Sequence, residues 1–137
     1  MLDRESVRQL LMAAESDYRA LNGMLAGGDE YFTDEAFGLF VQQALEKCLK
    51  VWLALNSISY PYTHSLRLLL KMLAETGMDV EPYWDLVDYS VFAVNGRYTH
   101  GVIDLEFDRE ECLERVGRLY ARVNQLFEIK EWPDPSV

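Results

Sequence analysis

Apolar residues recur at helical spacing along most of this chain. The first stripe alternates steps of four and three residues, as one face of an amphipathic helix does, and consists of Val7, Leu11, Ala14, Tyr18, Leu21 and Leu25. A similar stripe near the C-terminus consists of Cys112, Val116, Leu119, Val123 and Leu126. The full pattern predicts three long helices and two shorter ones, at residues 4–26, 34–55 and 109–128 and at residues 65–76 and 82–94.

Capping residues and helix breakers support these boundaries. Side chains that cap helix N-termini stand at the expected starts, namely Asp3, Thr33, Thr63 or Ser65, and Asp108. Glycine or proline follows the expected ends, at Gly27-Gly28, Pro61, Gly77 and Asn95-Gly96. The sequence therefore predicts an all-α fold, an up-and-down bundle of four to five helices. We expect one domain over residues 1–128 and a frayed tail over residues 129–137.

Composition narrows the class of protein. The 137 residues include 13 Lys and Arg against 23 Asp and Glu, a formal net charge of -10. Such a field repels phosphate, which argues against nonspecific binding to DNA or to an anionic membrane. No apolar run approaches the roughly 18 residues of a membrane helix, and the N-terminus lacks an apolar signal core. With Cys48 and Cys112 far apart, we expect reduced core thiols in a cytoplasmic protein.

The stretch FVQQALEKCLKVWL, residues 40–53, carries an unusual number of polar residues among apolar ones. On a helix, five of them fall within roughly 140° of one another: Gln42, Gln43, Glu46, Lys47 and Lys50. Glu46 and Lys50 also have the favourable i,i+4 spacing of an ion pair. Periodicity alone favours an ordinary solvated face, since charged helix faces usually point into water.

This stretch, followed by YPYTHSLRLLLKML, resembles the signature of the HEPN family of small helical domains. The resemblance rests on an aromatic residue, two glutamines, Glu-Lys, a second Lys, then Pro-x-Thr-His and a leucine-rich helix. These features fall on Phe40, Gln42, Gln43, Ala44, Glu46, Lys47, Lys50, Pro61, Thr63, His64, Leu66, Leu69 and Leu70. Arg97 and Tyr98 resemble the family's Arg-Tyr-Pro segment, although Thr99 replaces its proline. Ser65 replaces an Asp after the Thr-His, which leaves open what orients His64.

The resemblance implies a helical bundle, usually a homodimer, that is associated with nucleotides or RNA. Many such domains are partners of a minimal nucleotidyltransferase in pairs that resemble toxin–antitoxin modules. By this resemblance, we expect a nucleotide-binding pocket on the polar face and the segments after it, with ligand-binding residues Gln43, Glu46, Lys47, Lys50, His64, Arg97 and Tyr98. A pocket, a dimer-facing stripe and a solvated face remain the three alternatives for the polar face.

Some members of the family are metal-independent ribonucleases with Arg, four to six residues, then His. Neither histidine has an Arg at that distance, since residues 57–59 are Ser, Ile and Ser and residues 93–95 are Ala, Val and Asn. We therefore expect a module that is not catalytic on its own. The alternative is a divergent ribonuclease that uses Arg97 and His100, separated by two residues. The sequence offers no glycine-rich phosphate loop and no cysteine pair or His-Glu-x-x-His at metal spacing, so we expect no cofactor and no metal.

Overall fold

A computed structural model describes residues 3–27, 32–90 and 108–134 of the chain. It contains α1 (Arg4–Gly27), α2 (Asp34–Leu55), α3 (Leu66–Glu75), the 3₁₀ helix η1 (Glu81–Ser90) and α5 (Arg109–Ile129). No strand occurs in these three ranges. The predicted all-α bundle is confirmed, and the ends of α1, α2, α3 and α5 each agree with the prediction to within one residue.

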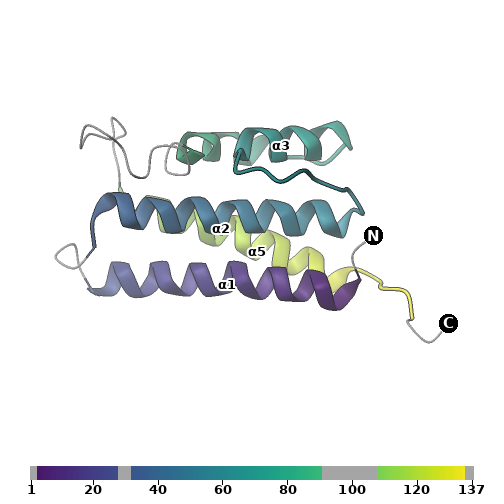
Figure 1. Cartoon of the computed structure of the whole chain (residues 1–137), viewed down its shortest axis with the longest axis horizontal. Coiled ribbons are helices and arrows are strands. Elements are labelled where there is room, and N and C mark those ends of the chain that lie inside the picture. The colour runs from purple at the N-terminus through teal and green to yellow at the C-terminus, as the bar shows by residue number, and fades with distance from the viewer. Residues whose placement is uncertain (1–2, 28–31, 91–107, 135–137) are drawn as a thin grey trace.

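Helix α2 lies at the centre of the bundle and contacts every other element (Figure 1). The long helices α1 and α5 pack on one side of it, and α3 with η1 packs on the other. Arg109 at the start of α5 bonds Asp34 at the start of α2, so these two helices run in the same direction. Arg4 lies over the ring of Phe127, so α1 and α5 run antiparallel. A central helix with neighbours on both sides has little surface left for water.

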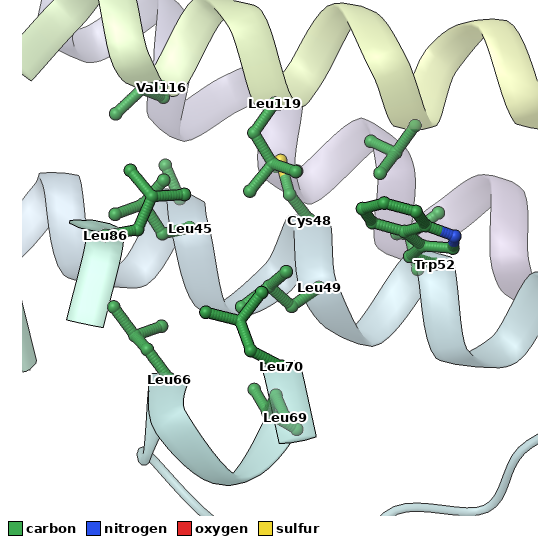
Figure 2. Close-up of a cluster of buried hydrophobic side chains, with 14 of the residues drawn as sticks. Leu45, Cys48, Leu49, Trp52, Leu66, Leu69, Leu70, Leu86, Val116 and Leu119 are labelled. Carbon is green, nitrogen blue, oxygen red and sulfur yellow. The ribbon is translucent and has the colours of Figure 1, made fainter. Parts of the chain in front are cut away.

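The core fills both sides of α2 (Figure 2). Leu45 and Leu49 of α2 meet Leu66 and Leu70 of α3, while Leu119 of α5 approaches Cys48 from the other side. All but Cys48, at 1 %, are fully buried. Both cysteines are buried free thiols, as predicted. Burial raises the pKa of Cys48 to about 12, with the charge of Asp17 as the smaller cause. Within the described ranges, no helix is long and apolar enough to cross a membrane.

Two predicted stripes need correction by one helical position. On α1, Asp17 and Met24 are buried, whereas Tyr18 and Leu25 are only partly buried. On α5, Phe127 is buried and Leu126 only partly. The reason for the first change is chemical, because Asp17 has a cationic partner on α2 that lets a carboxylate occupy a core position.

The fourth element is a 3₁₀ helix over Glu81–Ser90 instead of the expected α-helix over residues 82–94, of which residues 91–94 lie outside the described ranges. Its apolar residues explain the tighter winding. Val80, directly before the helix, and Tyr83, Leu86 and Tyr89 within it recur every three residues, which is the repeat of a 3₁₀ helix. Because the repeat matches, all four can face the core along ten residues, a length at which 3₁₀ helices are uncommon.

Side chains cap the N-termini of the four α-helices, and a turn ends α2. The side chains of Asp3, Thr33, Ser65 and Asp108 accept N-terminal amides as caps, so Ser65 and not Thr63 caps α3. Helix α2 ends in a Schellman turn in which the amide of Ile58 donates to the carbonyl of Leu53. Ser57 occupies the left-handed position of this turn with φ 56°, where glycine would be less strained.

Candidate functional site

Most of the polar face of α2 is covered by other parts of the chain. Gln42 and Glu46 are buried, and Gln43, Lys47 and Lys50 are partly buried. The expectation of an ordinary solvated face is therefore wrong. The physical reason is the central position of α2, because other segments of the same chain pack against its polar residues as well as its apolar ones.

Lys47 points toward α1. Its ammonium group donates to Asp17 Oδ2 at 2.6 Å, and the two side chains are 30 % and 12 % exposed. This ion pair joins the middle of α2 to the middle of α1. Gln43, one helical turn earlier, is also partly buried. Lys47 thus has a structural partner on α1, whereas the carboxylate that contacts His64 belongs to Glu46.

The opposite row, Gln42, Glu46 and Lys50, faces the connection between α2 and α3. The amide Nε2 of Gln42 donates to the carbonyl of His64 at 3.0 Å. Two turns further along α2, Lys50 Nζ lies 5.7 Å from the ring centre of Tyr60. Contacts with the connection thus move from Lys50 back to Gln42 as the chain advances from Tyr60 to His64. The connection therefore runs antiparallel to α2, as Figure 1 also shows.

The carboxylate that faces His64 comes from Glu46. Its Oε1 lies 2.8 Å from His64 Nδ1, and its Oε2 lies 3.5 Å from Lys50 Nζ. Ser65, the next residue, instead accepts the amide of Leu68 as the cap of α3. The question of what orients His64 is therefore answered by a residue 18 positions earlier in the chain.

An exposed aromatic ring completes this arrangement. Tyr62 is 90 % exposed, and its ring contacts the imidazole of His64 edge-on, with centroids 5.3 Å apart and an interplanar angle of 75°. Lys50 Nζ lies 6.0 Å from the centre of the same ring. We call Glu46, Lys50, Tyr60, Tyr62 and His64 the His64 cluster. It brings together a flat apolar surface, an imidazole, an ammonium group and a carboxylate.

Three of the predicted site residues meet in this cluster, namely Glu46, Lys50 and His64. The site predicted from the sequence did not include Tyr60 or Tyr62. The available signal was their position on either side of Pro61, which keeps the segment extended so that it can follow α2. The predicted Arg97 and Tyr98, and the alternative pair of Arg97 with His100, lie outside the described residues.

A second polar cluster joins η1 to α5. The hydroxyl of Tyr89 accepts from Cys112 Sγ at 3.2 Å and from Arg115 Nη1 at 3.5 Å. Arg115 also pairs with Asp85 at 3.3 Å and with Glu111. Burial is the first cause that raises the pKa of Tyr89 and of Cys112. With Tyr89 and Cys112 both buried, this cluster fastens η1 to the bundle. Nowhere in residues 3–27, 32–90 and 108–134 do three potential metal ligands gather.

A pocket of about 870 Å³ opens at the end of the bundle where α1 begins and α5 ends. The start of α1, Ala54 and Ser57, and residues 130–134 line it, and none of the predicted site residues does. In the tail that we expected to fray, Trp132 is partly buried and packs on Phe127 with ring centroids 5.7 Å apart. Because its lining carries both charges and belongs largely to exposed chain ends, this pocket is a weaker candidate than the His64 cluster.

Comparison with known proteins places the chain in a family. The family model described as "HEPN domain" matches residues 7–126, which is most of the chain and includes both α2 and the His64 cluster. No curated protein and no solved structure matches at a significant level. The family match agrees with the helical bundle and with the motif residues on α2 and in the connection after it. The chain belongs to the HEPN domain family.

Proposed function

We propose that this HEPN-type helical module binds a nucleotide at the His64 cluster and does no chemistry on its own. One observation carries the proposal. The ring of Tyr62 is 90 % exposed yet held between His64 and Lys50. An exposed aromatic ring is a stacking surface that accepts any nucleobase, because every base has a π-face.

A nucleobase stacked on Tyr62 would use the flat surface that the cluster offers. Stacking of a base on an aromatic side chain contributes about 1–3 kcal/mol. The phosphate of the same nucleotide would face the ammonium group of Lys50. Lys50 carries the positive charge that attracts the phosphate, although the carboxylate of Glu46, 3.5 Å away, already offsets part of this charge.

The charge of the whole chain limits the affinity. A protein with a formal net charge of -10 repels a polyanion. To bind a phosphate, it must therefore place Lys or Arg side chains at the site, where they offset its negative field. Lys50 supplies such a cation beside the rings of Tyr60 and Tyr62. This arrangement fits a single nucleotide better than a long nucleic acid, which would extend over the acidic remainder of the surface.

Calorimetric titration with AMP tests the proposal. Wild type should bind, Tyr62→Phe should bind nearly as well, and Tyr62→Ala should bind about 5- to 150-fold more weakly because the stacking surface is lost. Lys71→Ala is a matched control, since Lys71 is an exposed lysine in an i,i+4 pair with Glu75 on α3. Equal affinities of wild type and Tyr62→Ala, or no binding by wild type, would refute this function.

We also propose that the module acts as a homodimer and as the partner of a minimal nucleotidyltransferase in a toxin–antitoxin-like pair. Family membership supports both parts, and large apolar side chains remain exposed on the isolated chain, including Met12, Leu39, Leu68 and Ile129. Sedimentation at micromolar concentration should give a species of twice the 15.9 kDa chain mass. Co-purification followed by mass spectrometry should recover the nucleotidyltransferase. A monomer that brings down no such protein contradicts both parts.

Absence of ribonuclease activity is part of the same proposal. Phosphodiester cleavage needs a base and a cation held rigidly at one phosphate. Pure protein incubated at low salt with structured and unstructured RNA should leave both intact. Cleavage that is lost in both Arg97→Ala and His100→Ala would favour the ribonuclease alternative instead.

A further inference from the structure

His64 is held on one edge of its ring and open on the other. Nδ1 lies 2.8 Å from Glu46 Oε1, whereas Nε2 has no hydrogen-bond partner among the described residues. The side chain is 55 % exposed. Tyr62 meets the same imidazole edge-on, so the imidazole lies beside the stacking surface.

Glu46 can act only as an acceptor in this arrangement. Its second oxygen, Oε2, faces the ammonium group of Lys50 at 3.5 Å, and an ionised carboxylate has no proton to donate. The proton between Glu46 and His64 must therefore sit on Nδ1. In a neutral imidazole one nitrogen carries the proton and the other a lone pair. Nε2 is then the nitrogen with the lone pair.

The backbone of His64 is fixed independently of its ring. Gln42 is 1 % exposed, and its amide donates to the carbonyl of His64 at 3.0 Å. Only the NH₂ group of a glutamine can donate to a carbonyl, so the orientation of this amide is settled. Gln42 and Glu46 stand one helical turn apart on α2 and hold the same residue at two points.

We infer that Glu46, assisted by Gln42, is a positioning residue that fixes His64 in the Nδ1–H tautomer with Nε2 open as a hydrogen-bond acceptor. The inference rests on the proposed nucleotide function for its ligand. The neutral site selects molecules that present an O–H or N–H donor beside the ring stacked on Tyr62. A ribose hydroxyl and an exocyclic base amine are the two sources of such a donor on a nucleotide.

The tautomer can be measured without any ligand. The chain has two histidines, so long-range ¹H–¹⁵N spectra of labelled protein contain two imidazoles, and His64→Gln identifies the resonances of His64. At about pH 8.5, wild type should show His64 protonated on Nδ1 alone. Protonation on Nε2, or a mixture of both tautomers, overturns the inference whether or not a nucleotide binds.

Glu46→Gln should reverse the tautomer. Lys50 would attract the amide oxygen of the new side chain, which turns its NH₂ toward His64 Nδ1 and leaves the ring proton on Nε2. Glu75→Gln is the matched control, because it neutralises the acid of an exposed i,i+4 pair on α3 and should leave His64 unchanged. If Glu46 served stability alone, Glu46→Gln would have a lower melting temperature but the ring proton of His64 would stay on Nδ1.

Ligand analogues test the selectivity by the same calorimetric titration, with AMP as the reference. Removal of the donor that contacts Nε2 should weaken binding about two- to tenfold, the range of one hydrogen bond. The 2′-deoxy and 3′-deoxy analogues report on the ribose, and IMP, which replaces the amine by a carbonyl, reports on the base. Equal binding of all four overturns the selectivity. If none binds while the tautomer is as expected, the proposed function fails and the positioning of His64 stands.

Discussion

Lys47→Ala should destabilise the fold far more than the loss of an ordinary helical lysine. The change leaves the carboxylate of Asp17 in a position where its side chain is 12 % exposed and its 2.6 Å partner is gone. Breaking a fully buried ion pair costs about 3–5 kcal/mol, and breaking an exposed one about 0–1 kcal/mol. Lys47 itself is 30 % exposed, so water can reach part of the site.

An intermediate cost of about 2 kcal/mol in the free energy of unfolding follows. For a chain of this length that corresponds to a fall in melting temperature of roughly 8 °C. Calorimetric or circular dichroism melting of Lys47→Ala, Asp17→Ala and the double variant gives the coupling energy directly. The double variant should cost clearly less than the sum of the two single variants, because no charge is left unpaired.

The exposed pair of Lys71 and Glu75 provides the matched control. Its side chains are 66 % and 63 % exposed, and its coupling energy should not exceed about 0.5 kcal/mol. A stability of Lys47→Ala no lower than that of Lys71→Ala would show that the pair between α1 and α2 does not hold the helices together. Lys47 would then be free to serve a ligand, as the sequence suggested.

Three further predictions concern single positions. Burial raises the pKa of Cys48 to about 12 in the folded chain. The buried thiol therefore makes its full contribution to stability below about pH 9, and this contribution falls by at most about 1.4 kcal/mol per pH unit as the pH rises toward 12. In denaturant titrations, the free energy of unfolding of Cys48→Ala should fall less steeply with alkaline pH than that of wild type. Gly117→Ala should cost about 1–3 kcal/mol in thermal melting, since the added Cβ would lie 2.6 Å from the Tyr18 hydroxyl, and a wild-type melting temperature would mean that this ring moves freely. Ser57→Gly should raise the free energy of unfolding by about 1 kcal/mol because φ 56° strains a serine, and an unchanged or lower stability would contradict that reading of the turn.

Local chemistry explains why the helix boundaries could be predicted. Thr33 and Asp108 each cap a helix through their own side chain, and Gly77 closes α3 at φ 88°. These signals act within four residues of the chain, so no knowledge of tertiary contacts is needed. The extent of α2 could therefore be predicted to the residue from its sequence.

The partners of the polar residues could not be predicted in this way. Asp17 and Lys47 are 30 residues apart, and their contact depends on how α1 and α2 are rotated about their axes. A signal was present, since Asp17 follows Ala14 by three residues and precedes Leu21 by four, which is core spacing. An acid at such a position indicates a buried partner. The sequence does not say which of the 13 Lys and Arg residues it is.

The two rows of polar residues on α2 explain why one short motif can serve both fold and site. A helix with neighbours on both sides must satisfy its buried polar groups through those neighbours. Lys47 does so through α1, whereas Glu46 and the NH₂ group of Gln42 do so through the connection that carries His64. Since the second row holds the connection by its backbone and its imidazole, Tyr62 is left exposed on a supported segment instead of a free loop. Changes in the first row should therefore alter stability and changes in the second should alter ligand binding, although all of these residues lie within three turns of one helix.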